Sequence, residues 1–207
     1  MNQTQDFTKG VIWKQLLFFF FPILIGSFFQ QLYNTVDTII VGQAVGTSAL
    51  AAVGSTGNLT NLIVNFYVGL STGASVVIAQ YYGAQNDKKI HQAVHTSYTL
   101  AIVSGILMML FGLFFSYQCL DAIGTPHDIL TDATLYMQLY FLCMIPGAIY
   151  NIGAGILRAV GDSKRPLYYL IVCSIVNVVF DFIFVVIFHQ GIAGAAIATV
   201  IAQSVCA

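Results

Sequence analysis

Between Lys14 and Asp87 the chain carries a single charged residue, Asp37, within long runs of aliphatic and aromatic residues. Over all 207 residues only 7% are charged and 58% are apolar, whereas a soluble domain normally carries about 25% charged residues. So few charges cannot cover a globule of this size with a hydrated surface, which excludes a water-soluble enzyme and a disordered chain. The sequence therefore indicates an integral membrane protein.

Charged residues and small-residue turns divide the chain into apolar segments. A membrane-spanning helix needs about 20 residues, and irregular backbone is not tolerated against lipid. Polar breaks occur at 42–48, 83–89, 121–128, 158–166 and 189–191. The sequence thus predicts an all-α integral membrane protein with six transmembrane helices, at about 16–45, 58–82, 93–120, 130–157, 167–188 and 192–207.

All Lys and Arg residues fall on one side of this predicted topology. They lie before the first span or in the second-to-third and fourth-to-fifth connections: Lys9, Lys14, Lys88, Lys89, Arg158, Lys164 and Arg165. Because positively charged connections stay on the cytoplasmic side of a membrane, we predict a multi-pass protein of the cell (inner or plasma) membrane with a cytoplasmic N-terminus. The lipid bilayer is then its first partner.

Features of other protein classes are weak. Lys14 and the apolar residues 16–26 resemble a signal peptide, but no small-residue cleavage site follows. No HExxH, GxSxG or GxxxxGK[ST] motif occurs, and His91 and His95 have no evident third metal ligand. We therefore expect no enzyme, no cofactor and, with a net charge of −1, no nucleic-acid partner. The cysteines are expected to be ordinary helix residues: Cys119, Cys143, Cys173 and Cys206.

Two carboxylates, Asp37 and Asp181, interrupt the predicted spans. An ionisable group at such a depth costs several kcal/mol unless it faces a cavity or a partner. At 1.5 Å per residue, Asp37 lies roughly 8–12 Å, Asp181 about 10 Å and Thr199 about 12 Å below the outer surface, with Asn177 one turn from Asp181 on the same face. A shared polar cavity that opens outward explains this common level. Alternatively, Asp37 reaches the interface and Asp181 bonds Asn177 locally.

Several short motifs, each at its expected span, together carry a family likeness. They occupy 30–42, 69–75, 79–83, 155–166, 177–181 and 191–199. In this order the chain resembles, over essentially all of its length, the amino-terminal lobe of the multidrug and toxic compound extrusion (MATE) transporters. The resemblance implies one six-helix lobe of a two-lobed antiporter. Such a protein uses a sodium or proton gradient to export organic cations and other drug-like molecules by alternating access.

The resemblance also assigns roles to residues. It places the coupling cation, Na⁺ or H⁺, at Asp37, Asn177, Asp181 and Thr199. Positions that match cavity-lining residues are Gln30, Tyr33, Tyr136 and Asn151, although Asn151 lies about 30 Å along the fourth span and reaches the site only if that span is bent. Two carboxylates, an amide and a hydroxyl form an oxygen ligand set that suits Na⁺, and two adjacent carboxylates in a low-dielectric cavity can instead share a proton.

The length of the chain keeps other interpretations open. Family members have two lobes and about twice this length, so the chain is expected to be either a fragment or a half-transporter that pairs with a second six-helix lobe, with the carboxy-terminal lobe absent from residues 1–207. The alternatives are a flippase of lipid-linked precursors from the same superfamily, and a non-transporting membrane subunit or truncated remnant. No Lys or Arg is predicted within a span, which argues against the flippase.

Overall fold

The computed structural model describes residues 11–207, and within them every regular element is helical. Lys9, which contributed to the predicted orientation, lies outside the described residues. Seven α-helices and one π-helix follow in the order α1 (Ile12–Ala44), α2 (Thr47–Gly83), α3 (Asp87–Ala122), α4 (His127–Leu142), α5 (Met144–Ala159), α6 (Lys164–Asp181), η1 (Phe182–Ile187) and α7 (Gly191–Cys206).

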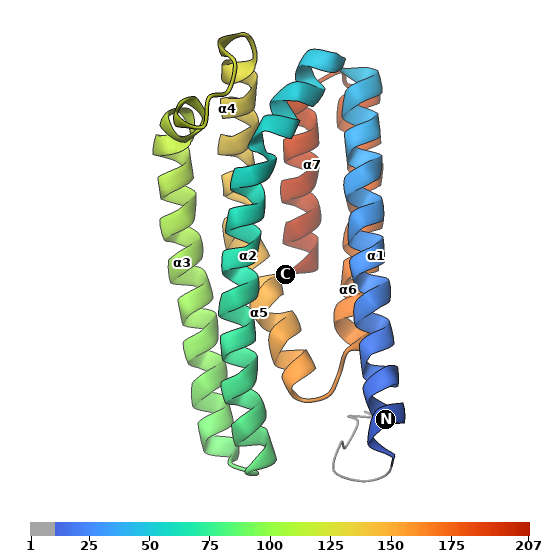
Figure 1. Ribbon diagram of the computed structural model, residues 1–207, viewed down its shortest axis with the longest axis vertical. Helices are drawn as coiled ribbons and strands as arrows, with labels where there is room; N and C mark the ends of the chain where they lie inside the picture. The colour runs from blue at the N-terminus through green and yellow to red at the C-terminus, as the bar shows by residue number, and fades with distance from the viewer. Residues whose placement is uncertain (1–10) are drawn as a thin grey trace.

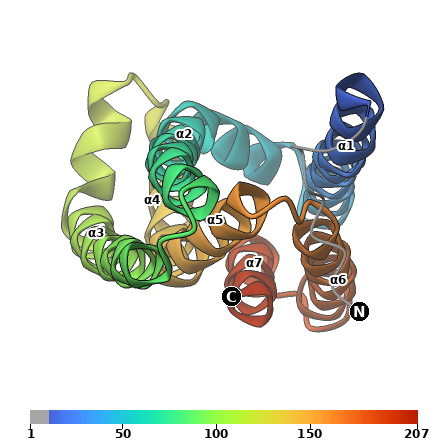
Figure 2. The ribbon, with the colours of Figure 1, turned by 90° about the horizontal axis from the view of Figure 1, so that it is seen from below.

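The helices form two groups that meet along a seam. One group contains α2, α3, α4 and α5, which pack closely on one another, and the other contains α1, α6, η1 and α7. Seen from below, the two groups lie side by side (Figure 2). In Figure 1, α1 and α2 stand at the front of the seam, with α7 behind them. Because α1 packs chiefly against α6 and only sparsely against α2, it belongs to one group alone.

The six predicted spans appear in the predicted order, which confirms the fold class. Four helical segments are long and apolar enough to cross a membrane: α1, α2, α3 and the continuous α6–η1. The α4–α5 pair makes a fifth when counted as one bent span, and α7 is a shorter apolar helix. The second span begins at Thr47, not near residue 58, because its small residues continue a helix in which no proline occurs. The turn before it is only two residues long, Val45 and Gly46. The φ of Gly46 is +113°, a value that suits only glycine.

The fourth predicted span is broken, which corrects the expectation of one continuous helix over 130–157. Helices α4 and α5 meet at Cys143 with a bend of 50°. Pro146 has no N–H to donate to the carbonyl of Leu142, and its ring clashes with a carbonyl four residues earlier in a regular helix. α4 ends at that residue. The bend turns the last half of the span, and with it Asn151, toward the seam.

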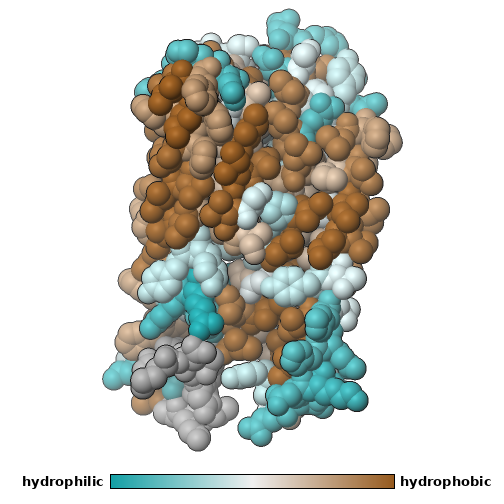
Figure 3. All heavy atoms as spheres, turned by 180° about the vertical axis from the view of Figure 1, so that it is seen from behind, coloured by the Kyte–Doolittle hydropathy of each residue, from teal (hydrophilic) through white to brown (hydrophobic). Residues whose placement is uncertain are grey.

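An apolar belt surrounds the bundle. Phe18, Leu62 and Phe114 are each more than 60% exposed, and many other large apolar side chains point outward. In the view from behind, brown apolar residues cover the middle of the molecule and teal polar residues gather at its two ends (Figure 3). A surface of this kind is stable only against lipid. The chain is therefore a multi-pass membrane protein.

Candidate cation site and substrate cavity

The end of α6 holds two deeply buried polar side chains. Asp181, the last residue of α6, is 0% exposed, and Asn177, one turn earlier, is 2% exposed. A buried polar group is costly unless it finds a partner. Both oxygens of Asp181 and Oδ1 of Asn177 nevertheless have no hydrogen-bond partner among the described residues. These oxygens are therefore available to a ligand.

Thr199 joins this pair from α7. The Asn177 amide donates to the Thr199 hydroxyl over 3.5 Å, and that hydroxyl donates to the carbonyl of Ala195 over 3.1 Å. The second bond is the local one that a helical threonine often makes, so the Thr199 oxygen retains only its role as an acceptor. A cation near Asn177 would find that oxygen in place.

Asp37 brings a second carboxylate from α1. It is half-buried, and its side chain lies close enough to Asp181 to interact with it directly. One Asp37 oxygen is buried without a hydrogen-bond partner, and neither carboxylate forms an ion pair in the described part of the chain. Three helices thus bring together the buried polar cluster, defined as Asp37, Asn177, Asp181 and Thr199. Its chemistry suits one small cation or one shared proton.

The backbone changes form directly after Asp181. Residues Phe182–Ile187 form the π-helix η1, where the N–H of Phe188 donates to the Ile183 carbonyl over 2.9 Å. Gly194 of α7 packs closely against this turn. A Cβ added at Gly194 would lie only 3.1 Å from the carbonyl carbon of Phe184, so a larger residue would not fit without a shift. π-helical turns occur often at functional sites. Here the wider turn and the close approach of α7 both lie directly after Asp181.

Tyr136 belongs to the surroundings of the buried polar cluster. It is 7% exposed on α4, stacks on Tyr140 with ring centroids 6.2 Å apart, and lies within electrostatic range of Asp37 and Asp181. α4 comes from the other helix group. Tyr136 therefore lies next to the buried polar cluster on the side where the two helix groups meet.

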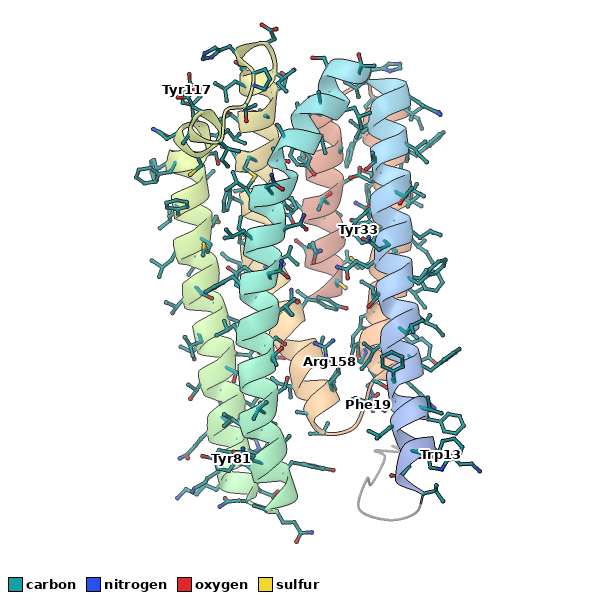
Figure 4. All side chains as sticks on the ribbon, in the orientation of Figure 1. Trp13, Phe19, Tyr33, Tyr81, Tyr117 and Arg158 are labelled. Carbon is teal, nitrogen blue, oxygen red and sulfur yellow. The ribbon has the colours of Figure 1, made fainter. Side chains whose placement is uncertain are left out.

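A separate cavity of about 460 Å³ occupies the seam beside the cluster. Gln30 and Tyr33 of α1 and Asn151 of α5 line it, whereas Tyr136 and the four cluster residues do not. The lining runs from Tyr33 to Arg158, toward the end of the molecule where the described basic residues gather (Figure 4). This cavity is distinct from the outward-opening polar cavity that the sequence predicts around Asp37 and Asp181, which stays a prediction.

Asn151 lies on α5, after the bend between α4 and α5, and lines the cavity. Its side-chain amide donates to the Gly147 carbonyl over 2.8 Å, and its own carbonyl accepts the Ser71 hydroxyl over 2.6 Å. Gly155 permits this contact with α2, because a Cβ there would overlap the Ser71 hydroxyl. Asn151 thus reaches the cavity, as the resemblance implied for a bent span, but not the cluster.

Comparison with known proteins identifies the family. The MatE family profile matches residues 22–183. The chain belongs to the MatE family. The probable multidrug resistance protein YoeA of Bacillus subtilis is 31% identical over 175 residues, which cover 84% of this chain and 38% of that protein. YpnP of the same organism, also a probable multidrug resistance protein, is 30% identical over 200 residues, or 97% of this chain and 45% of that protein.

A solved structure agrees with this assignment. The crystal structure of MATE in the bent conformation superimposes on all of this MatE chain with a TM-score of 0.91 and 27% identity, and the match covers 46% of that chain. The resemblance read from the motifs is therefore confirmed. The MatE chain spans less than half the length of these relatives, which corresponds to one lobe.

The sequence did not predict that two polar residues of this MatE chain, Arg158 and Tyr67, line the cavity. Arg158 was assigned to a connection, but it lies within α5, lines the cavity and has no ion-pair partner in the described part of the chain. Tyr67 of α2 also lines the cavity, and its buried hydroxyl has no hydrogen-bond partner there. A charge at the edge of a span is a signal that could have marked Arg158. One tyrosine among eleven carries no such signal.

Proposed function

We propose that this chain is the amino-terminal lobe of a cation-coupled exporter of drug-like organic cations. It acts by alternating access with a second six-helix lobe, in a second copy or in the same gene product, in the cell membrane with its N-terminus in the cytoplasm. We expect it to need no cofactor and to catalyse no reaction. The observation that carries the proposal is the pair of neighbouring carboxylates, half-buried Asp37 and buried Asp181, on two helices and without an ion-pair partner in the described residues.

The coupling mechanism follows from the repulsion between these carboxylates. When both are charged, they favour a state in which α1 and α6 separate or water enters between them. A bound proton or Na⁺ neutralises the pair and favours closer packing of α1 on α6. Because α1 also lines the cavity through Gln30 and Tyr33, its movement changes the space for a substrate. The cation and substrate then bind different states, as coupled transport requires.

The cluster suits both candidate ions, for different reasons. A proton needs only the two carboxylates, whereas Na⁺ needs several oxygen ligands. Asn177 Oδ1 and the Thr199 hydroxyl oxygen supply neutral oxygens beside Asp181. Replacing Thr199 by valine should therefore weaken sodium-driven export while leaving proton-driven export nearly intact.

Gradient-driven dye efflux tests the proposal. In host cells or membrane vesicles, Asp37→Asn and Asp181→Asn should each reduce efflux at least about tenfold, which corresponds to about 1.4 kcal/mol. The matched control is Asp121→Asn, an exposed acid at the end of α3. Full efflux with both cluster variants would contradict the proposal, since the carboxylates would then be structural only.

A second candidate is the movement of a substrate that carries an anionic group, as in a flippase of lipid-linked precursors. Arg158 supports it, because this cation lines the cavity and none of the described lining residues is Asp or Glu. In the same assay, Arg158→Gln should reduce transport of anionic or zwitterionic compounds and spare purely cationic dyes. If cationic dyes are not moved by the parent protein at all, the second candidate, or the non-transporting subunit, replaces the first.

A further inference from the structure

Three of the four cysteines line the seam cavity. Cys143 comes from the junction of α4 and α5, Cys173 from α6 and Cys206 from α7, while Cys119 lies elsewhere. The Cys143 thiol donates to the Tyr140 carbonyl in its own turn over 2.8 Å. Cys173 and Cys206 make no such local bond. Their thiols reach across to the neighbouring helix.

The cross-helix contacts of Cys173 and Cys206 are reciprocal. The Cys173 thiol donates to the carbonyl of Ala202 over 3.4 Å, and the Cys206 thiol donates to the carbonyl of Tyr169 over 3.3 Å. Each acceptor lies one helical turn before the opposite cysteine, so the two thiols lie side by side between α6 and α7. The two cysteines thus face each other across the α6–α7 contact. The sequence alone predicts ordinary helix residues at both positions.

We propose that Cys173 and Cys206 form a two-sulfur site that binds a thiophilic ligand entering from the cavity. The ligand class is one that takes two sulfur donors: a trivalent arsenical or a two-coordinate soft metal ion. Among the described residues, no third His, Cys, Asp or Glu completes a larger metal site. Three-donor and four-donor zinc sites are thereby disfavoured.

The location keeps both thiols available. The cavity reaches toward Arg158, the end predicted to face the cytoplasm, where thiols remain reduced. Cys173 lies one turn from Asn177 on α6, and α7 carries both Cys206 and Thr199. A ligand that bridges the two sulfurs therefore fixes α6 to α7 directly below the buried polar cluster. Binding at this site would restrict any movement between those helices.

The binding step balances for an organic arsenoxide. Two As–S bonds form, the arsenic–oxygen bond breaks, and the oxygen leaves as water with the two thiol protons. Arsenic stays trivalent and nothing is oxidised or reduced. Because the second bond is intramolecular, a bridged arsenical should resist a competing monothiol about 10²-fold better than one held by a single cysteine.

The test uses phenylarsine oxide on the protein purified in detergent, followed by a wash with excess monothiol and measurement of intact mass. We expect one retained phenylarsenic group per chain, removable by a small dithiol, and protection of Cys173 and Cys206 from maleimide. Cys173→Ser and Cys206→Ser should each abolish retention after the wash. Cys119→Ser and Cys143→Ser are the matched controls and should retain the group.

Two results would overturn the site. One is retention in both single variants, which would place the arsenical on Cys143 or elsewhere. The other is complete loss to monothiol in the parent protein, which would mean that the two sulfurs do not act together. Helix content and elution volume of each serine variant show that it is folded. Neither readout depends on transport, so the outcome is independent of the proposed function.

Discussion

At the scale of single residues, Asp181 is fully buried, yet neither of its carboxylate oxygens has a hydrogen-bond partner among the described residues. A carboxylate that is 0% exposed, near a second carboxylate and without a hydrogen-bond partner in the described residues, lowers the stability of the fold. Proteins keep such groups mainly where function requires them. The destabilisation expected from the Asp181 carboxylate therefore indicates a functional role, and it can be measured.

We predict that Asp181→Asn stabilises the protein while it impairs export. The introduced amide removes a buried charge and can donate to the partnerless oxygen of Asp37, a bond worth about 1.5–3 kcal/mol. A rise in the thermal unfolding midpoint in detergent measures this gain, with Asp121→Asn as the control. A marked fall in the midpoint would mean that the Asp181 charge serves the structure, as in the local alternative.

The positions of site residues could be predicted only where helix periodicity is combined with a known distance from the end of a span. The spacing of four between Asn177 and Asp181 places both on one face, and counting from the span ends brings Thr199 and Asp37 to the same level; the structure brings all four together. Their role in binding a cation stays a prediction. Tyr136 also lies near the cluster, but Arg158 was misjudged, because counting charges cannot tell a helix end that faces a cavity from a loop.

At the scale of elements, the apolar segments could be predicted and their irregularities could not. Composition and length determine where a helix can cross a membrane, which explains the agreement in number and order. The break at Cys143 and the π-helix after Asp181 depend on individual hydrogen bonds and on close contacts such as Gly194 with Phe184. Pro146 alone did not decide the outcome, since Pro22 lies inside the uninterrupted α1.

We predict that Pro146→Ala weakens export without unfolding the protein. Alanine restores an N–H and removes the clash with the Leu142 carbonyl, so α4 and α5 can join into a straighter helix. Asn151 and Arg158 then turn away from the cavity. We expect helix content to stay constant and efflux to fall about tenfold, a change of about 1.4 kcal/mol. Pro22→Ala is the matched control, and equal efflux by both variants would show that the bend is not needed.

At the scale of the whole molecule, charge defines two ends. Lys14, Lys88 and Lys89 lie at the end where α1 and α3 begin. Three more basic residues lie where α5 ends and α6 begins: Arg158, Lys164 and Arg165. The opposite end carries Asp121, Asp128 and Asp132 instead. All the described basic residues thus lie toward one end of the bundle, the lower end in Figure 1, where α1, α3 and α6 begin. From the positive-inside rule we propose that this end, toward which the cavity extends, lies in the cytoplasm.

Two helix ends offer a matched pair of sites with which to test this orientation. Ala84 and Ile123 are the residues that follow α2 and α3; both are exposed and both have right-handed backbone conformations. They lie at opposite ends of the bundle, because α2 and α3 run antiparallel through a short connection (Figure 1). Neither side chain takes part in a hydrogen bond that a cysteine would remove. Ala84→Cys and Ile123→Cys therefore differ mainly in the side of the membrane they report.

In intact cells, a membrane-impermeant maleimide should label Ile123→Cys and leave Ala84→Cys unlabelled until the membrane is permeabilised. The parent protein measures the background from its own cysteines, of which Cys143 and Cys173 are buried. The reverse labelling pattern would place the basic end outside. The cavity would then face the exterior, and Cys173 and Cys206 would lie in an oxidising compartment. Labelling of both variants in intact cells would mean that the helices do not cross the membrane as a single oriented bundle.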